Sequence, residues 1–415
     1  MHGSMNKKII ICIVGLGYVG LPLARLFSKR YRTIGYDNNP CRIKELASAG
    51  EDNIIFTNST DDIKECNFYI VAVPTPVDIN NRPNLSALIQ ASETIGTVIA
   101  KDDIVVYEST VYPGVTEEEC IPRIEEVSGM KLNTDFYAGY SPERINPGDK
   151  LHSVENIMKV TSGSTTEAAD LIDNIYRSVL KNGTYKVSSI KVAEASKIIE
   201  NAQRDVNIAF INELAKIFNA MDIDTKEVIE AASTKWNFIK MCPGLVGGHC
   251  ISVDPYYLIQ KAQVYGVLPR IMIEARKLND GMGEYVAEQV IKTMNKKGLM
   301  VKDAKILLLG FSFKENCPDI RNTKVADIYT TLSEYTKNIT VYDPYCDKKK
   351  VEQTYKIKIQ NQGPESLTGL FDVVVLCVAH DAFRSLSIRT FLNSKNGVVY
   401  DVKGILDKKD IDGRL

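Results

Sequence analysis

A thiol and a carboxylate lie close together in one glycine-rich stretch of the chain. Its residues run Gly247-Gly248-His249-Cys250-Ile251-Ser252-Val253-Asp254. Two glycines before a cysteine leave space for the close approach of a substrate, and Asp254 follows Cys250 by one turn if a helix begins there. This pattern fits a nucleophilic cysteine with a partner acid. A buried structural cysteine fits the residues equally well. A metal site on His249 and Cys250 is disfavoured, because neighbouring residues rarely ligate one ion.

A phosphate-binding glycine pattern lies near the start of the chain. Gly15, Gly17 and Gly20 form a GxGxxG that follows the apolar run 8–14 and opens a segment with helical spacing. The glycines permit a tight turn and a close approach of backbone to pyrophosphate, and the helix N-terminus offers free N–H groups. Asp37 ends the next strand-like run, where a carboxylate accepts from ribose hydroxyls and repels a 2′-phosphate. The sequence therefore predicts an NAD site.

Three neighbouring residues are further candidates for contact with the cofactor. Tyr18 and Val19 lie inside the glycine loop, and Arg42 follows Asp37 by five residues. The arginine leaves some tolerance for NADP open. A glycine turn with an incidental aspartate is the alternative, but strand, loop, helix and acid all occur in the expected register.

A helical stripe of polar residues is a second candidate for catalysis. Lys197, Asn201 and Arg204 stand at positions i, i+4 and i+7 of a long helical pattern, so they share one face. Apolar residues lie next to this face, which would let it border a cleft. A solvated polar stripe is the alternative that the residues alone leave open.

Strand-like apolar runs alternate with helical patterns at both ends of the chain, which predicts parallel sheets. The runs are 8–14, 33–36, 68–73, 103–110, 135–143, 305–311, 338–344, 372–378 and 397–402. Only Gly310 follows the first run of the second set, so that part is expected to bind a different ligand. The predicted fold class is α/β, with two doubly wound Rossmann-like domains joined by a long central helix and a helical dimerisation domain.

The middle of the chain is predominantly helical. Residues 190–219 contain neither Pro nor Gly and keep apolar positions at helical spacing, which predicts a helix about 45 Å long. More helix is predicted to about 231 and over 269–295, with a glycine-rich loop at 243–255 between them. We therefore expect a homodimer that covers the apolar face of the long helix. The expected domains are 5–189, 190–297 and 298–415.

Composition argues against partners that bind through bulk charge. The 415 residues include 51 Lys and Arg and 52 Asp and Glu, a formal net charge of −1, whereas nucleic-acid and membrane binders usually carry a basic excess. No apolar run reaches the ~18 residues of a spanning helix. The nine cysteines form no CxxC, which predicts a reduced, cytoplasmic protein without a metal site. Residues 1–4 precede a second Met and are interpreted as an expression remnant.

Three motifs occur in order along the chain: GLGYVGLPLA at 15–24, PGLVGGHCISVDPYYL at 243–258 and GFSFKENCPDIRNT at 310–323. With them the sequence resembles the UDP-glucose/GDP-mannose dehydrogenase family over nearly its whole length. The resemblance implies an NAD-dependent enzyme that oxidises the C6 alcohol of a nucleotide sugar to a carboxylate with two NAD. It also implies an N-terminal Rossmann domain, a central helical dimer domain and a C-terminal nucleotide-sugar domain.

The resemblance implies roles for individual side chains as well. The implied catalytic group is Cys250 as nucleophile, Asp254 as its partner carboxylate, Lys197 and Asn201 as oxyanion stabilisers, and Glu143 and Thr110 as holders of the catalytic water. The implied further cofactor contacts are Thr75, Thr110 and Arg321. The implied substrate contacts are Glu143, Arg144, Lys197, Asn201, Gly247, Lys314 and Lys403.

One departure from the family pattern indicates a branch. UDP-glucose members typically read PEFLREG, whereas this chain has Pro147 in place of the second glutamate. It resembles the branch that acts on UDP-N-acetylhexosamines, and INPGDK at 145–150 resembles the N-acetylglucosamine and N-acetylgalactosamine enzymes more than the mannosamine ones. Enzymes for UDP-N-acetylmannosamine or UDP-glucose remain the alternatives. A role in bacterial surface polysaccharide such as capsule is implied.

The implied chemistry is a four-electron oxidation. The C6 alcohol becomes an aldehyde, the Cys250 thiolate adds to give a thiohemiacetal, a second oxidation gives a thioester, and water releases the acid. A water held by Thr110, Glu143 and Asp254 is the expected base, with Lys197 as the alternative. A β-hydroxyacid dehydrogenase would make one NADH rather than two and would leave Cys250 unexplained. A non-enzymatic NAD-sensing module would need a further element that passes the signal on, such as one that binds DNA, and the sequence shows no basic recognition helix.

Overall fold

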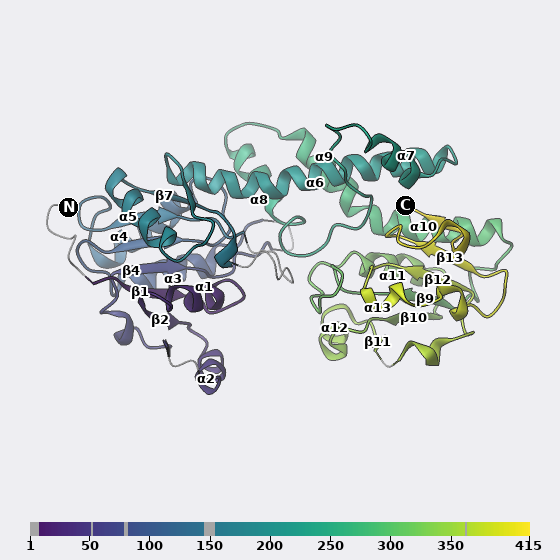
Figure 1. Cartoon of the computed structure of the whole chain (residues 1–415), viewed down its shortest axis with the longest axis horizontal. Helices are drawn as coiled ribbons and strands as arrows, with labels where there is room; N and C mark the ends of the chain where they lie inside the picture. Colours follow the sequence, from purple (N-terminus) through teal and green to yellow (C-terminus); the bar gives the residue numbers. More distant parts are fainter. Residues whose placement is uncertain (1–7, 51–52, 79–81, 145–153, 362) are drawn as a thin grey trace. The chain divides into compact units, whose positions relative to one another are not determined.

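The structure is a computed structural model that describes residues 8–50, 53–78, 82–144, 154–361 and 363–415 (Figure 1). The chain folds into two compact units. The N-terminal unit comprises residues 1–200 and 256–267, and the C-terminal unit comprises residues 201–255 and 268–415. Each unit is built on its own sheet, so the predicted α/β class with two doubly wound sheets is confirmed.

The sheet of the N-terminal unit has the strand order β3-β2-β1-β4-β5-β6-β7-β8. All neighbouring strands are parallel except β6 and β7, which are antiparallel with Gly139 opposite Gly163. The chain leaves β1 for β2 on one side and returns to β4 on the other, so the order reverses at β1, where open α/β sheets bind ligands. The strands are β1 (Ile10–Val14), β2 (Arg32–Tyr36), β3 (Ile54–Thr57), β4 (Phe68–Val71), β5 (Ile104–Tyr107), β6 (Tyr137–Tyr140), β7 (Lys159–Gly163) and β8 (Thr184–Lys186).

Alternate residues of the central strands face two separate apolar cores. In β1, Cys12 and Val14 pack with helices α3 and α4, while Ile11 and Ile13 pack with α1 and α5. Continuous apolar runs are typical of strands covered on both faces, which explains why the sequence predicts them. The helices are α1 (Gly20–Phe27), α2 (Pro40–Ser48), α3 (Ser86–Gly96), α4 (Ile121–Ser128) and α5 (Thr166–Arg177).

The C-terminal unit repeats this plan on a smaller sheet. Its strand order is β11-β10-β9-β12-β13-β14, with every neighbouring pair parallel. The strands are β9 (Ile306–Leu309), β10 (Ile339–Tyr342), β11 (Ile359–Gln360), β12 (Val373–Leu376), β13 (Val398–Asp401) and β14 (Gly413–Arg414). The helices that follow strands of this sheet are α11 (Val325–Ser333), α12 (Lys348–Tyr355) and α13 (Asp381–Arg384). Figure 1 shows β9, β10 and β12 side by side in this unit.

The helices of the middle segment match the sequence prediction in part. The long helix is α6 (Ile190–Ala220), and α7 (Thr225–Ala232) begins after a break capped by Asp224. The predicted helix at 269–295 is two helices, α9 (Arg270–Asp280) and α10 (Met282–Lys296), separated at Gly281. Helix α8 (Asp254–Val264) was not predicted, because its start lies inside the stretch interpreted as a glycine-rich loop.

The prediction also omits β3, β7, β8, β11 and β14, which lie toward the edges of the two sheets. The outermost of these strands are short and partly exposed, and β7 is buried but mostly polar, so none has the continuous apolar run that marks a central strand. Across the described part of the chain, no helix is both long and apolar enough to cross a bilayer.

Candidate active site

The glycine loop after β1 has the shape that a bound dinucleotide needs. Gly15 has φ +92°, and a Cβ there would lie 2.9 Å from Val73 Cγ1. A Cβ on Gly20 would lie 1.7 Å from the Gly15 carbonyl oxygen, so this glycine lets α1 pack against the loop. A Cβ on Gly17 would meet nothing within 4 Å, which leaves its backbone open to a ligand. Turn, open backbone and close helix packing are the three functions of these glycines in a dinucleotide site.

The predicted cofactor residues beside this loop hold its shape. Asp37 accepts hydrogen bonds from the backbone N–H of Leu16 and of Asn39, each at 2.9 Å. Arg42 Nε donates to the Leu16 carbonyl at 3.0 Å, so its guanidinium supports the loop. Val19 occupies the N-cap position of α1 without a side-chain cap, which leaves N–H groups of the helix start for an anion. The exposed ring of Tyr18 lies next to it.

A chain of hydrogen bonds joins the two predicted threonines. Thr75 Oγ1 donates to the Thr110 carbonyl at 2.6 Å. The hydroxyl of Tyr257, on α8, donates to the Thr75 carbonyl. Tyr257 is fully buried and lies in the helix that starts at Asp254. Tyr257 was not predicted, since its only signal in the sequence is its place in the motif PGLVGGHCISVDPYYL.

Glu143 is 9% exposed and has a buried acidic neighbour that the sequence analysis missed. Glu108, at the end of β5, forms a fully buried ion pair with Lys159 and accepts from the Tyr176 hydroxyl at 2.6 Å. Burial raises the pKa of Glu108, the charge of Lys159 opposes that rise, and the charge of Glu143 adds to it. The two carboxylates are therefore electrostatically linked, and Lys159 compensates negative charge in this part of the N-terminal unit.

The polar stripe on α6 divides into buried and exposed residues. Lys197 and Asn201 are 7% and 8% exposed, whereas Arg204 is exposed. One turn before Lys197, the buried Glu194 accepts from the backbone N–H of Gly114 at 2.5 Å and of Thr116 at 2.9 Å. Glu194 thus fixes the loop that follows Thr110. Arg144 ion-pairs with Glu200 and donates to the Met158 carbonyl at 3.0 Å.

In the C-terminal unit, the thiol and its candidate acid lie one helical turn apart, as the sequence predicts. The Asp254 N–H donates to the Cys250 carbonyl at 2.8 Å, and Asp254 is the first residue of α8. Asn201 Nδ2 donates to Asp254 Oδ2 at 2.6 Å. Asp254 is 2% exposed and Cys250 is half-buried, so the acid is enclosed and the thiol remains reachable.

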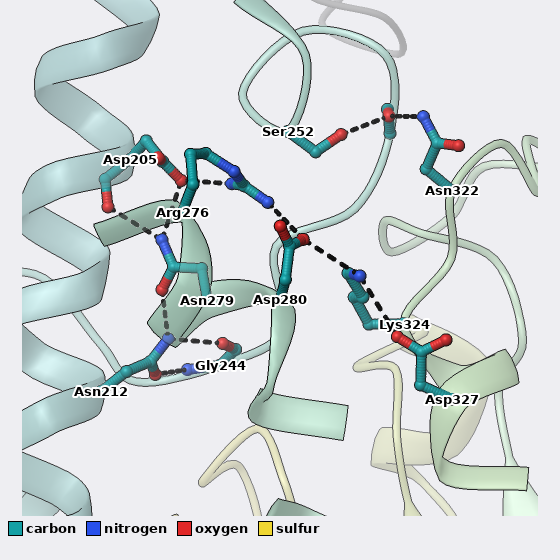
Figure 2. A network of polar contacts seen from close by, with 11 residues as sticks. Asp205, Asn212, Gly244, Ser252, Arg276, Asn279, Asp280, Asn322, Lys324 and Asp327 are labelled. Atoms are coloured by element: carbon teal, nitrogen blue, oxygen red, sulfur yellow. Dashed lines mark hydrogen bonds and ion pairs between the residues drawn. The ribbon is translucent and has the colours of Figure 1, made fainter. Parts of the chain in front are cut away.

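The two glycines before the thiol are required by the chain's own packing, a reason that the sequence alone does not give. A Cβ on Gly247 would lie 2.6 Å from the Asn322 carbonyl oxygen. Gly248 has φ +87°, and a Cβ there would lie 2.8 Å from the ring of Phe313. Figure 2 shows Ser252 and Asn322 hydrogen-bonded to the backbone between them, where both donate to the Gly248 carbonyl, at 2.6 and 2.8 Å. Segment 310–323 therefore packs on the thiol loop.

Two predicted ligand residues of the C-terminal unit, Arg321 and Lys403, lie next to this loop. Arg321 donates from Nε to Asp319 at 2.9 Å, and its carbonyl accepts from Gly248 N–H at 3.1 Å. The hydrogen bond to Asp319 raises the pKa of Arg321 most, and negative charge on Cys250 adds to the rise. Lys403 Nζ would lie 3.8 Å from a Cβ on Gly244. The carbonyl of Lys314 accepts from Ser312 at 2.8 Å.

The predicted catalytic residues fall into two groups. Thr110, Glu143 and Lys197 belong to the N-terminal unit, whereas Asn201, Cys250 and Asp254 belong to the C-terminal unit. The structure joins Asn201 to Asp254 by a hydrogen bond, and Asp254 follows Cys250 by four residues. The segment with Pro147, on which the prediction of the sugar rests, lies outside the described residues.

Three family models match the chain in order. They are the NAD binding domain of the UDP-glucose/GDP-mannose dehydrogenase family over residues 9–180, its central domain over 191–281, and its UDP binding domain over 307–408. The chain belongs to this family. The resemblance inferred from the three sequence motifs is confirmed.

Relatives and solved structures agree with this assignment. The chain is 50% identical over 424 residues to UDP-N-acetyl-D-glucosamine 6-dehydrogenase of Salmonella typhi, covering 98% of this chain and 99% of that protein. It is 51% identical to the enzyme of the same name from Pseudomonas aeruginosa, covering 99% and 100%. Among solved structures, UDP-D-ManNAc dehydrogenase from Pyrococcus horikoshii matches with a TM-score of 0.87 at 28% identity, covering 98% of each chain.

Family membership fixes the cofactor and the class of reaction. The NAD binding domain contains the glycine loop, so NAD is the cofactor of a nucleotide-sugar dehydrogenase, as predicted. The UDP binding domain covers β10 to β13 and all but the first residue of β9, after which only Gly310 follows. Its ligand is the UDP-sugar, which confirms that the two sheets serve different ligands.

Proposed function

We propose that the protein oxidises the C6 alcohol of a UDP-N-acetylhexosamine, UDP-N-acetylglucosamine or its galacto epimer, to the uronic acid. The observation that carries this proposal is the Cys250–Asp254 turn with Asn201 bonded to the acid, because a thiol is needed to hold the aldehyde for a second oxidation. The similarity to two UDP-N-acetyl-D-glucosamine 6-dehydrogenases at about half identity supports the sugar. The product would be an acidic sugar suited to a bacterial surface polysaccharide.

The proposed reaction proceeds through covalent attachment to Cys250. The alcohol is first oxidised to the aldehyde, and the thiolate adds to C6 to form a thiohemiacetal. Oxidation of the thiohemiacetal gives a thioester, which water hydrolyses to the free acid and the thiol. NAD accepts the hydride that leaves C6 in each of the two oxidations.

We assign the other residues by their contacts and by the resemblance to the family. Lys197 and Asn201 stabilise negative charge on the C6 oxygen, and an amide nitrogen that donates one N–H to Asp254 keeps a second N–H for this task. Asp254, Glu143 and Thr110 hold the water that takes up protons. Arg321 keeps the cofactor contact that the resemblance implies, and its carbonyl accepts from the Gly248 N–H of the thiol loop.

The binding contacts remain proposals of the same kind. The cofactor group is Gly15, Gly17, Tyr18, Val19, Asp37, Arg42, Thr75, Thr110 and Arg321. The substrate group is Glu143, Arg144, Lys197, Asn201, Gly247, Lys314 and Lys403. The functional domains remain proposed at 5–189, 190–297 and 298–415. A homodimer and a cytoplasmic location also remain predictions, and the nine free cysteines accord with the latter.

The decisive experiment is an NADH assay with a panel of UDP-sugars. We expect two NADH for each sugar consumed, and a higher kcat/KM for UDP-N-acetylglucosamine or UDP-N-acetylgalactosamine than for UDP-glucose or UDP-N-acetylmannosamine. One NADH per sugar would refute the four-electron reaction. A preference for UDP-glucose would refute the proposed branch while leaving the reaction class intact.

A further inference from the structure

One buried side-chain amide holds the start of the loop that carries Cys250. Asn212, on α6, donates from Nδ2 to the Gly244 carbonyl at 3.0 Å and accepts from the Gly244 N–H at 2.8 Å. Asn212 is fully buried, and Figure 2 shows it reaching from α6 to Gly244. Two hydrogen bonds to one residue fix both the position and the orientation of its backbone. The loop therefore leaves a fixed point six residues before the thiol.

The orientation of this amide is set by its neighbours. Asn212 Nδ2 also donates to Asn279 Oδ1 at 2.8 Å, and Asn279 Nδ2 donates to Asp205 Oδ1 at 2.8 Å. Arg276 Nη1 donates to the same carboxylate oxygen at 2.6 Å. All of these side chains are fully buried, so none can exchange its partner for bulk water. Because the Asp205 carboxylate can only accept, it fixes which end of the Asn279 amide faces it, and Asn279 in turn fixes the orientation of the Asn212 amide.

A second hydrogen bond fixes the loop at Gly248, and its donor lies two residues from the end of this network in the chain. Arg276 Nη2 donates to Asp280 at 2.5 Å, and Lys324 forms an ion pair with Asp280 at 3.1 Å. Lys324 follows Asn322 by two residues, and Asn322 Nδ2 donates to the Gly248 carbonyl. Figure 2 shows the contacts from Asn212 through Arg276 and Asp280 to Lys324 as one set, and the bond from Asn322 to the loop backbone as a separate set. The loop is thus held at Gly244 and again at Gly248, two residues before Cys250.

We propose that Asn212 is a positioning residue for the Cys250 thiol. This rests on the proposed function, in which Cys250 is the nucleophile. Asn212 acts by fixing the Gly244 backbone, and the direction of the Cys250 side chain follows from the course of the loop that runs from Gly244 through Gly248 to the thiol. A thiol displaced by about 1 Å adds to the aldehyde about 100-fold more slowly. Binding of NAD does not depend on that displacement.

The test replaces Asn212 by alanine and follows the fate of the aldehyde. In Asn212→Ala we expect kcat to fall about 10- to 100-fold with a KM for NAD close to that of the unaltered protein. With hydroxylamine present, the slow addition of the thiol lets the aldehyde be captured as an oxime. The yield should then fall from two NADH per sugar toward one.

A matched control lies on the same helix. Asn219 is seven residues further along α6, is half-buried, and donates to the Tyr285 hydroxyl at 3.2 Å rather than to the loop. Asn219→Ala should keep kcat and two NADH per sugar. Alkylation by iodoacetamide, mapped by mass spectrometry, gives an independent readout, since the rate at Cys250 should change in Asn212→Ala while the exposed Cys41 reacts as before.

A second variant keeps the proposal testable if Asn212→Ala does not fold. Asn322 has φ +49°, which glycine adopts without strain. Asn322→Gly removes the donor to Gly248 and should also lower the NADH yield in hydroxylamine. If the folded variants keep two NADH per sugar and the original alkylation rate at Cys250, the positioning role is wrong. If Cys250→Ala itself still gives two NADH per sugar, the proposed function has failed instead.

Discussion

Asn201 and Asp254 are hydrogen-bonded at 2.6 Å although 53 residues separate them in the chain. Both side chains are buried, and the bond ties α6 to the first residue of α8. The amide thus meets the acid one helical turn after Cys250. This contact links the candidate oxyanion donor to the partner of the thiol.

Substitution of Asn201 should damage catalysis more than binding. Asn201→Ala removes an N–H donor from the proposed oxyanion site and a partner of the buried Asp254, so we expect kcat to fall about 10²–10³-fold. Steady-state kinetics with saturating NAD will measure it. Asn207→Ala, on the same helix, is the control and should leave kcat unchanged. An Asn201→Ala enzyme with unaltered kcat would remove Asn201 from the proposed mechanism.

Cys250 should be essential for release of the acid. Cys250→Ser still permits the first oxidation and attack on the aldehyde, but an oxygen ester hydrolyses more slowly than a thioester. A labelled sugar should remain covalently attached, and turnover should fall by orders of magnitude. Cys250→Ala should bind the substrate and release no acid. Cys242→Ala is the control, because Cys242 is exposed and outside the Gly-Gly-His-Cys motif. A dead Cys242→Ala with an active Cys250→Ala would overturn the mechanism.

Asp37 should make NAD the preferred cofactor. Its carboxylate is half-buried at the end of β2 and would repel a 2′-phosphate. Asp37→Asn keeps an oxygen that can accept from the Leu16 N–H and removes the charge, so the ratio of kcat/KM for NAD to that for NADP should fall. Asp61→Asn, at an exposed site, should leave that ratio unchanged. Equal efficiency of the unaltered enzyme with both cofactors would contradict the prediction.

The exposed apolar side chains of the C-terminal unit should be covered by a second copy of the chain. Phe210, Ile217 and Met221 are exposed on and just after α6, and Trp236 is 92% exposed after α7. Large exposed apolar patches are typical of subunit interfaces. We expect a dimer by light scattering at micromolar concentration, and a monomer for Phe210→Glu with Trp236→Glu. Met300→Glu, at another exposed site, should remain dimeric. A monomeric unaltered protein would refute the dimer.

The ionised carboxylate of Asp343 should stabilise the fold, and this stabilisation should be lost when the carboxylate is protonated at low pH. It is fully buried after β10, where it hydrogen-bonds His380 and accepts from four backbone N–H groups. Burial alone would raise its pKa, but these hydrogen bonds outweigh burial and lower the pKa to about 2. Since the unfolded value is about 3.9, the ionised carboxylate stabilises the fold fully above about pH 4, and this contribution is lost as pH falls toward 2.

Asp343→Asn should therefore lower the free energy of unfolding by about 2 kcal/mol at neutral pH. The difference from the unaltered protein should shrink between about pH 4 and 2. Urea unfolding at a series of pH values will measure both. The exposed Asp407→Asn should show no such loss. A difference that is constant with pH would show that ionisation of Asp343 does not stabilise the fold.

The parts of the site that the sequence predicts are those set by short stretches of chain. The spacing of Gly15, Gly17 and Gly20 after an apolar strand dictates a turn and a helix start, because only glycine fits the left-handed and close-packed positions there. The turn from Cys250 to Asp254 is local in the same way. The central strands are also predictable, since burial on both faces requires continuous apolar runs.

The residues that the sequence analysis missed act across long separations. Tyr257 reaches Thr75 over 182 residues, Lys159 pairs with Glu108 over 51, and Asn279 meets Asn212 over 67. Each is an ordinary polar residue in a helical or strand pattern, and nothing in its neighbourhood marks its partner. The glycines at 247 and 248 were noticed, but the reason for them was not, because Phe313 and Asn322 come near only in the folded chain.

The sequence by itself determined the fold class, the NAD loop, the thiol motif and the family, because turns, strand burial and helix spacing depend on neighbours in the chain. Only the tertiary structure decided which buried polar groups pair and how the thiol loop is held at Gly244 and Gly248. Those pairings follow from the packing of segments far apart in sequence. Burying a donor or acceptor without a hydrogen-bond partner costs free energy. Each pairing is therefore set by the fold as a whole, in which the buried polar groups find partners together.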